Sequence, residues 1–413
     1  MHQVVITGLG AVTPVGLDRE STWQGLLNGK SGVGPITAFD ASHLPTRIAA
    51  EVHGFDPATV LGGKRLRRTA RFSQFAVAAA REAIADAGLT IDEDLGRRTG
   101  IVINAAVAGF DTVEDATRRV AAEPAARLSP YFVASSLTNM PACEVAIDLG
   151  VHGPVTASAL ACASGIAALL EARRLILAGE ADVVICGGTD AAIRPVMFSG
   201  LTSMGAMSTR NDDPAAASRP FDADRDGFVF GEGAVIAVLE SAEHARRRGK
   251  VPYAAFAGGA LTEDAFHVSA PEPDGQYATA AIEQALSRAV VSPRDVDYIC
   301  AHGTSTKAND RTETMAIRRA FGGAAEDVAI SSPKSMVGHL IGAAGALGAL
   351  VCTLAIRDGT VPPTINLDTP DPECDLDYVP NAARTVPVGV AITNAFGFGG
   401  QNCVGVFARV TSS

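Results

Sequence analysis

The stretch Val155-Thr156-Ala157-Ser158-Ala159-Leu160-Ala161-Cys162-Ala163-Ser164-Gly165, followed by Ile166 to Ala178, indicates the fold class of this chain. Val155 to Ser158 is typical of a strand, and small residues follow it. Ile166 to Ala178 then has apolar residues three or four positions apart, which predicts a helix. Gly179 directly after it is a common helix end. A strand that turns sharply into a helix is typical of α/β proteins.

The same alternation runs along most of the chain. We expect buried strands at 4–7, 99–104, 183–187 and 235–240, and helices at 72–88, 164–178, 277–290 and 343–357. Alternating strands and helices predict parallel sheets covered on both faces. A composition change at Arg246-Arg247-Arg248-Gly249-Lys250 predicts two domains, 1–250 and 251–413. Each part has a strand, a reactive-looking loop and an Ala/Gly-rich helix, which is consistent with internal duplication.

Composition excludes several classes of protein. Of 413 residues, 47% are hydrophobic and 19% are charged, which excludes a mainly disordered chain. The net charge of −11 argues against a generic nucleic-acid binder. Seven scattered cysteines without zinc spacing indicate a reduced, cytoplasmic protein with no metal site. The N-terminus lacks signal-peptide features, and apolar stretches such as 347–356 are too short to span a membrane.

Two motifs resemble known ligand sites but lack required parts. Gly8-Leu9-Gly10-Ala11-Val12-Thr13 starts like a dinucleotide fingerprint, but its third glycine is missing and Thr13-Pro14 favours a turn. Asp222-Ala223-Asp224-Arg225-Asp226-Gly227 starts like a calcium loop, but position twelve is Gly233. The next residues, 228–230, look like a strand. We therefore expect a structural turn with paired charges.

Cys162 is the first candidate functional residue. The turn places its thiol at a helix N-terminus, where unpaired amides and the helix dipole favour thiolate. Small neighbouring residues leave room for a substrate. Most free cysteines are apolar core residues, but the strand-to-helix position favours a nucleophile here.

Two histidines and a lysine lie in similar settings further along the chain. His302 ends the strand 297–300 and is followed by Gly303-Thr304-Ser305-Thr306. His339 follows Gly338 and precedes an Ala/Gly-rich helix, and Lys334 lies five residues before it. Single histidines and lysines are more often ordinary surface or core groups. Strand and helix ends beside small residues, however, are where α/β proteins carry functional groups.

The fourth candidate element is the loop Asn394-Ala395-Phe396-Gly397-Phe398-Gly399-Gly400. Its glycines leave the amides free to point at an oxyanion. A tight β-turn is the alternative, and the glycines alone do not decide between the two.

Together these motifs resemble the β-ketoacyl-acyl-carrier-protein synthases (ketosynthases) of the thiolase superfamily. The resemblance covers essentially the whole chain, including 6–10, 208–212, 219–222, 225–233 and the final Gly-Phe-Gly-Gly loop. It implies a thiolase-like α/β fold of two duplicated halves, each with a five-stranded sheet, stacked as α-β-α-β-α layers. It also implies a dimer.

The resemblance further implies a decarboxylative Claisen condensation. Cys162 would take an acyl chain from carrier protein, and a malonyl-type extender would lose CO2 and attack it. His302 and His339 match the two family histidines, and Lys334 matches the lysine that organises the site. The resemblance implies that the amides of Cys162 and Phe398 form the oxyanion hole and that the Phe398 side chain acts as gatekeeper. It implies that Thr304 and Thr306 bind the pantetheine arm. It also implies that Glu313 and Asp310 are partners of Lys334. No bound cofactor is implied, because the phosphopantetheine arm arrives on the carrier protein.

A basic cluster matches the family's contact region for the acidic carrier protein. A local positive patch is what an enzyme of net charge −11 needs to attract such a partner. The matching residues are Lys64, Arg65, Arg67, Arg68, Arg71 and, at a second contact position, Arg127. A solvated helix face is the alternative for any single member. Gly205 replaces a further family arginine.

Two branches of the family are represented. The loop 394–400 is similar to fatty-acid elongation enzymes, whereas His302 to Thr314 and Asp368 to Pro380 are similar to type II polyketide ketosynthases. Lys307-Ala308-Asn309 replaces the Pro-x-Gly of fatty-acid enzymes, and residues 104–109 depart from their Gly-rich stretch. The mixture resembles highly reducing, polyene-forming systems. We therefore favour a polyketide ketosynthase, with fatty-acid elongation as the alternative.

Two other readings fit less well. A non-catalytic chain-length factor typically lacks the nucleophile, so Cys162 argues against it. A thiolase acting on coenzyme A esters needs a second C-terminal cysteine motif, which His302, His339 and the core-like Cys403 do not supply. The pairing stays open between a homodimer and a heterodimer with a chain-length factor.

Overall fold

The computed structural model describes residues 3–410, and its strands divide equally between two halves of the chain. The N-terminal sheet has the order β5-β4-β6-β7-β1 and the C-terminal sheet the order β8-β14-β13-β9-β10. A short antiparallel pairing of Val5 with Ala255 and Ile6 with Ala254 joins β1 to β8, so that the ten strands form one continuous order. The matching orders agree with the expected duplication.

The N-terminal strands are β1 (Val4–Val12), β4 (Thr99–Asn104), β5 (Val155–Thr156), β6 (Val183–Asp190) and β7 (Gly233–Ser241). The C-terminal strands are β8 (Ala254–Glu263), β9 (Tyr298–Cys300), β10 (Ala329–Ser331), β13 (Val390–Gly397) and β14 (Gln401–Ala408). The predicted boundary at residue 250 falls between β7 and β8. Two small ribbons, β2–β3 (Gly34–Pro35, Ile48–Ala49) and β11–β12 (Thr360–Val361, Arg384–Thr385), lie outside the main order.

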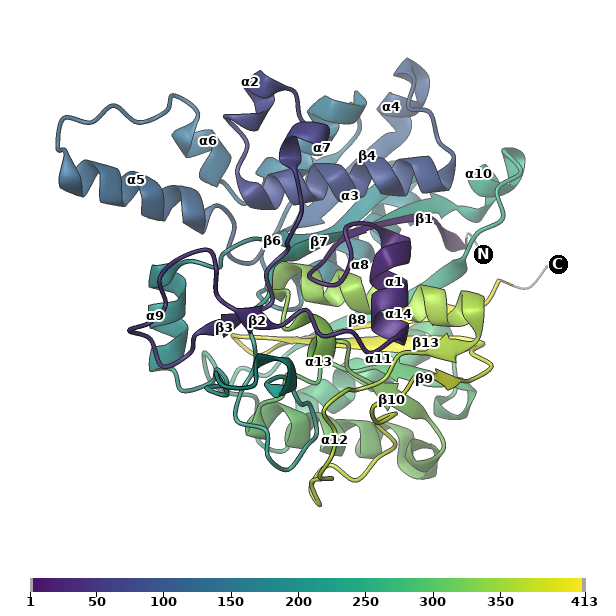
Figure 1. Ribbon diagram of the computed structural model, residues 1–413. Helices are drawn as coiled ribbons and strands as arrows, with labels where there is room; N and C mark the ends of the chain where they lie inside the picture. The colour runs from purple at the N-terminus through teal and green to yellow at the C-terminus, as the bar shows by residue number, and fades with distance from the viewer. Residues whose placement is uncertain (1–2, 411–413) are drawn as a thin grey trace.

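Figure 1 shows the helices in three layers around the two sheets. α3 (Arg71–Ala87) and α7 (Met140–Leu149) cover the N-terminal sheet, and α11 (Gln276–Ala289) and α12 (Lys307–Phe321) cover the C-terminal one. α8 (Ser164–Leu177) and α14 (Ala344–Asp358) pack together between the sheets. The layers are therefore α-β-α-β-α, as the family resemblance implies.

The remaining helices border these layers. They are α1 (Arg19–Leu27), α2 (Gly63–Leu66), α4 (Glu93–Arg98), α5 (Phe110–Ala122), α6 (Phe132–Ser136), α9 (Pro195–Ser203), α10 (Ala242–Arg247) and α13 (Lys334–Val337). α5 and α6 project from the body as an arm beside α2. Both ends of the described chain lie on the opposite side of the molecule.

Two expectations about the strands are wrong. The sheets are mixed rather than parallel, because β7 and β14 run antiparallel to both of their neighbours. Residues 228–230 form isolated bridges instead of a strand, one of them joining Phe230 to His339. Alternating strands and helices predict crossovers, but they reveal neither the direct hairpin between β13 and β14 nor the antiparallel pairing of β7 with β6 and β1 across long connections.

The apolar helix at the centre, α14, matches the helix predicted at 343–357. Together with the short turn before it, the segment Ile341–Asp358 is long and apolar enough to cross a membrane by length and composition alone. However, 83% of this segment is buried inside the protein. A helix that is apolar all round belongs either in a membrane or in the core of a large protein, and this one lies between the two sheets.

Candidate active site

Cys162 lies in the turn between β5 and α8, and neighbouring segments hold this turn in a strained shape. Ala161 has a φ of 44°, a left-handed conformation that costs about 1–3 kcal/mol for a non-glycine residue. The side chain of Asn104, at the end of β4, braces both sides of the turn. It accepts a hydrogen bond from Ser158 N at 2.8 Å and donates one to Ser164 O at 2.9 Å.

Burial dominates the ionisation of Cys162, which is 6% exposed. Burial raises the pKa of the Cys162 thiol to about 11, although the charge of Lys334 and the amides of Phe398 and Cys162 act to lower it. The amide of Cys162 at the helix N-terminus lowers the thiol pKa, in the expected direction, but burial outweighs this effect. The thiol is protonated at neutral pH, and the surrounding donors stabilise negative charge only when it develops.

The loop between β13 and β14 closes over the turn of Cys162. A Cβ on Gly397 would lie 2.8 Å from Leu160 O and 3.3 Å from Cys162 N, so only glycine fits this approach. The next amide, that of Phe398, faces the Cys162 sulfur. The Phe398 side chain is 42% exposed, at the outer side of the site. Gly399 N donates a hydrogen bond to Val268 O at 2.9 Å, which ties the loop to the segment after β8.

His302 follows β9, and a buried carboxylate on α12 holds its main chain. Glu313 accepts hydrogen bonds from His302 N at 2.8 Å, from Gly303 N at 2.7 Å and from Asn394 Nδ2 at 3.0 Å. Burial raises the pKa of Glu313, and these donors lower it. One carboxylate thus fixes both the histidine segment and the loop that carries Phe398.

Lys334, at the start of α13, lies behind His302. Its Nζ donates to His302 O at 2.5 Å, and burial lowers the pKa of its ammonium. Neither Glu313 nor Asp310 lies within ion-pairing distance of it among residues 3–410. Both carboxylates instead raise the Lys334 pKa through their charge. Their expected partnership with Lys334 is therefore electrostatic and not a direct contact.

The segment 228–231 positions His339. His339 N donates to Val229 O at 2.7 Å, and Gly231 N donates to His339 O at 2.9 Å. Ile341 N donates to His339 Nδ1 at 3.2 Å, which assigns the ring proton to Nε2. His339 Nε2 has no hydrogen-bond partner within the described part of the chain, so a buried N–H donor is left for a substrate oxygen.

The ring centroids of the two imidazoles lie 5.4 Å apart, and the rings meet edge to face with an interplanar angle of 83°. Burial and the charge of Lys334 hold the pKa of each well below its usual range, so both rings are neutral at pH 7. His302 Nδ1, like His339 Nε2, lacks a partner among the residues described. Two neutral, buried rings with free nitrogens can polarise a carbonyl and exchange a proton.

The hydroxyls of Thr304 and Thr306 lie 2.9 Å apart on the segment after His302. Thr306 also caps α12 by accepting a hydrogen bond from Asn309 N at 3.4 Å. Asp310, in the first turn of α12, forms an ion pair with Arg225 at 3.3 Å and accepts from Phe221 N at 2.9 Å. Its direct partners therefore differ from the expected one.

Asp190, at the end of β6, was missed by the sequence analysis. This buried carboxylate accepts main-chain hydrogen bonds of 2.8–3.1 Å from Ala106, Val107, Ala108 and Gly342. Burial raises the Asp190 pKa to about 6, and its charge also raises the pKa of Cys162. The available signal was a charged residue at the end of an otherwise apolar strand.

The basic cluster divides into two groups. Arg65 forms ion pairs with Glu144 and Asp148, and Arg71 forms one with Glu232 at 2.7 Å. The guanidinium groups of both arginines are therefore already paired with carboxylates of this chain. Arg68 lies 4.0 Å from Glu144 and over the ring of Tyr131. The remaining members are exposed and form no ion pair within residues 3–410: Lys64, Arg67 and Arg127.

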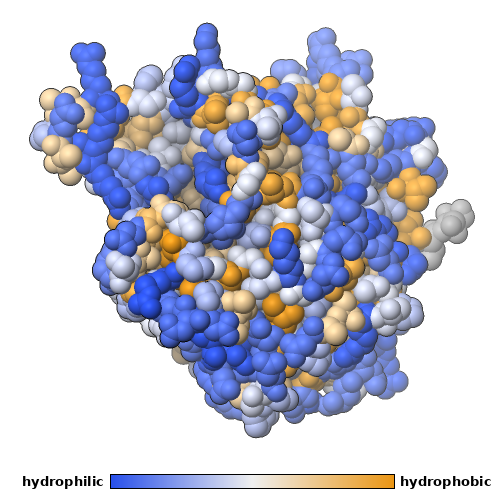
Figure 2. Space-filling view, viewed as in Figure 1, coloured by the Kyte–Doolittle hydropathy of each residue, from blue (hydrophilic) through white to orange (hydrophobic). Residues whose placement is uncertain are grey.

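A hollow of about 250 Å³ lies beside this cluster, beneath the arm formed by α5 and α6. Arg67, Arg68 and Arg119 line it, together with Thr69 and Ser129. Figure 2 shows the arm as a mixture of hydrophilic and apolar surface. No group of three or more metal-binding side chains occurs in the part of the chain that the structure describes.

Comparison with known proteins gives consistent matches. Residues 1–245 match "Beta-ketoacyl synthase, N-terminal domain" and residues 253–368 match "Beta-ketoacyl synthase, C-terminal domain". The chain is 48% identical to "3-oxoacyl-[acyl-carrier-protein] synthase 2" of Synechocystis sp., over 98% of both chains. It is 46% identical to the protein of the same name in Coxiella burnetii, over 99% of both.

Two solved structures have similar folds. "The ishigamide ketosynthase/chain length factor" superposes with a TM-score of 0.93 at 36% identity, covering 99% of this chain and 100% of the other. A chain of the AntDE:AntF complex gives a TM-score of 0.91 at 35% identity with the same coverage. That complex is described as a type II PKS acyl-carrier protein with its ketosynthase bound to the hexaketide.

Proposed function

Because the chain belongs to the β-ketoacyl synthase family and is a 3-oxoacyl-[acyl-carrier-protein] synthase, we propose that it condenses acyl and malonyl units through Cys162 in a type II polyketide pathway. The observation that carries this proposal is that the charge of Lys334 acts on the Cys162 sulfur and on the neutral rings of His302 and His339, so that all three groups lie around one buried cation. A nucleophile, oxyanion donors and proton-exchanging groups are the parts that acyl transfer requires.

In the first step, the Cys162 sulfur attacks the thioester carbonyl of an acyl-carrier protein. The thiol proton passes to a neutral imidazole of the site as the new C–S bond forms, and the amides of Cys162 and Phe398 stabilise the oxyanion. Collapse of the tetrahedral intermediate breaks the bond to the pantetheine sulfur, which takes this proton and leaves as a thiol. Because the Cys162 pKa is about 11, these donors act on charge that develops during the attack.

In the second step, a malonyl thioester enters with its carbonyl oxygen at His339 Nε2 and His302. Loss of CO2 leaves an enolate, whose oxygen accepts hydrogen bonds from the two rings. The enolate carbon then attacks the Cys162 thioester, which forms the new C–C bond and breaks the C–S bond. The released Cys162 sulfur takes a proton from water and returns to the thiol. The two half-reactions share one site, as ping-pong catalysis requires.

Thr304 and Thr306 are proposed to bind the pantetheine arm, and the exposed Lys64, Arg67 and Arg127 to bind the acidic carrier protein. The arginine-lined hollow beside Arg67 supports docking at this face. Arg65 and Arg71 are not docking groups in this proposal, because buried carboxylates occupy them. No resident cofactor takes part, and the seven free cysteines favour the cytoplasm.

A second subunit of the same fold is proposed to cover the edge of the sheet at β5. β5 ends the strand order, and an open strand edge is a site for pairing with another chain. Apolar side chains on the nearby arm and α7 are exposed, among them Tyr131, Val133, Leu137 and Ile147. Contiguous apolar surface of this kind marks an interaction site.

Fatty-acid elongation is the second candidate function. The observation that favours it is the 46–48% identity to proteins named 3-oxoacyl-[acyl-carrier-protein] synthase 2. The motif at Lys307-Ala308-Asn309 and the type II polyketide structures favour the first. The two candidates differ in the subunit that pairs with this chain.

The deciding experiment incubates the purified chain with acyl- and malonyl-carrier protein, alone and with a co-encoded chain-length factor, and detects 3-oxoacyl product by mass spectrometry. Condensation only with the partner supports the polyketide function. Condensation by the chain alone supports fatty-acid elongation. Absence of product in both reactions contradicts the proposed mechanism.

A further inference from the structure

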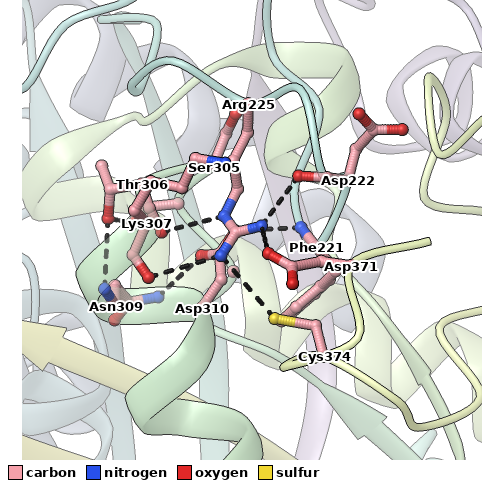
Figure 3. A network of polar contacts seen from close by, with 12 residues as sticks. Phe221, Asp222, Arg225, Ser305, Thr306, Lys307, Asn309, Asp310, Asp371 and Cys374 are labelled. Carbon is pink, nitrogen blue, oxygen red and sulfur yellow. Dashed lines mark hydrogen bonds and ion pairs between the residues drawn. The ribbon is translucent and has the colours of Figure 1, made fainter. Parts of the chain in front are cut away.

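Arg225, in the turn that resembles a calcium loop, lies at the centre of a buried polar network (Figure 3). Its side chain is 1% exposed, and all three guanidinium nitrogens have partners. Nη1 contacts Asp222 O at 2.7 Å and Asp371 Oδ2 at 2.5 Å. Nη2 lies 3.8 Å from Cys374 Sγ. These contacts fix the guanidinium in place.

The other contacts of Arg225 reach the segment that carries the threonines. Nε donates to Thr306 O at 3.2 Å and lies 3.3 Å from Asp310 Oδ2, and Nη2 donates to Lys307 O at 3.4 Å. Figure 3 shows the guanidinium between this segment and Asp371. Arg225 therefore holds the backbone on which the Thr306 hydroxyl is placed, while it compensates the charge of Asp310.

The segment needs to be held, because its backbone is strained at the central residue. Ser305 has a φ of 69°, a left-handed conformation unfavourable for a non-glycine residue. This conformation puts the hydroxyls of its two neighbours, Thr304 and Thr306, 2.9 Å apart. Arg219 N, three residues before this turn, donates to Ser305 Oγ at 3.0 Å and so contacts the strained residue from a second point.

We propose that Arg225 is a positioning residue for substrate binding: its guanidinium holds the Thr304–Thr306 pair in the geometry that binds the pantetheine arm. This inference rests on the proposed role of the two threonines. Arg225 acts through the main chain of Thr306 and Lys307 and does not touch the reacting atoms. Its loss is expected to weaken binding of pantetheine thioesters while the reactivity of Cys162 is retained.

The first test is Arg225→Lys, which keeps a positive charge beside Asp310 and Asp371 but loses the planar fork. We expect the KM for malonyl-pantetheine to rise about tenfold, as for the loss of one or two hydrogen bonds. The alkylation rate of Cys162 by iodoacetamide, which needs no pantetheine site, is expected to stay unchanged. Arg248→Lys is the matched control, because Arg248 forms a two-point pair with the buried Glu240 on β7.

A double-mutant cycle with Thr304→Val separates positioning from general destabilisation, because Thr304 does not cap a helix. If Arg225 acts through the threonine pair, the double variant raises KM little more than either single variant. The inference is overturned if the KM increase of the double variant equals the product of the two single increases. It is also overturned if Arg248→Lys raises KM as much as Arg225→Lys does. Asp371→Asn, which loosens Arg225 from the opposite side, is the second variant if Arg225→Lys does not fold.

The outcome for the wild type keeps this inference apart from the proposed function. A wild-type chain that fails to condense overturns both. A wild-type chain that condenses, together with an unchanged KM in Arg225→Lys and Asp371→Asn, overturns the inference alone.

Discussion

The Nζ of Lys334 donates a hydrogen bond to the main-chain oxygen of His302 at 2.5 Å. This contact places a buried cation behind His302, and the charge of this cation acts to lower the pKa of the Cys162 thiol. The same cation lowers the pKa of both His302 and His339. Burial is the larger cause of the low imidazole pKa values, and the same ammonium group adds to it while it favours negative charge on sulfur.

The pH dependence of Cys162 alkylation follows from these shifts. Burial raises the thiol pKa to about 11, so the thiolate fraction and the rate with iodoacetamide should rise with pH up to that value. Lys334→Met removes a charge that lowers this pKa, so the variant should react more slowly at every pH below it. Peptide mass mapping measures the rates at Cys162 alone. A wild-type plateau near pH 8, or a faster variant, would contradict the electrostatic account.

Substitution at Gly397 tests the oxyanion amides. In Gly397→Ala the new Cβ would meet Leu160 O at 2.8 Å and push the Phe398 amide away from the Cys162 turn. We expect acyl transfer to fall about 10²-fold, the effect of losing one oxyanion-hole donor. Gly389→Ala, just before the same strand, meets only Asp297 Oδ2 at 3.4 Å and is the control. Equal rates for the two variants would exclude this role of the loop.

Charge reversal at Arg67 tests carrier docking. Arg67 is exposed and lines the hollow beside α5, so Arg67→Glu should raise the KM for malonyl-carrier protein about tenfold at low salt, with less effect at high salt. The KM for malonyl-pantetheine should not change. Arg246→Glu makes the same charge change on α10, away from the hollow. Similar losses from both variants would point to net charge and not to a docking site.

A charge on the arm tests the dimer. Val133 is 64% exposed on α6, and Val133→Glu should shift the protein toward monomers in sedimentation or light-scattering measurements. Val251, which is 83% exposed between α10 and β8, gives the control Val251→Glu. If the Val133→Glu protein has the same oligomer mass in solution as the wild type, the arm does not contact the second subunit.

The core elements could be predicted from the sequence because they depend on local patterns. The helix expected at 72–88 is α3 (Arg71–Ala87), and the strand expected at 99–104 is β4, because apolar spacing and end residues determine both. The turn of Cys162 was also found, since small residues between a strand and a helix mark it. These features need no knowledge of distant contacts.

What the sequence could not reveal depends on distant partners. Arg65 and Arg71 read as free basic residues, yet carboxylates far along the chain neutralise them: Glu144, Asp148 and Glu232. The protonated state of Cys162 depends on how much protein covers it. Asp190 gave little signal, because its four amide partners lie in two loops far from it in sequence.

Intact-mass spectrometry of the protein incubated with acyl-carrier protein is the most direct test of the account that Cys162 carries the acyl chain. The wild type should gain the mass of one acyl group and lose it when malonyl-carrier protein is added. Cys162→Ala should gain none. Acylation of Cys162→Ala to the wild-type extent, or no acylation of a folded wild type, would contradict the central claim.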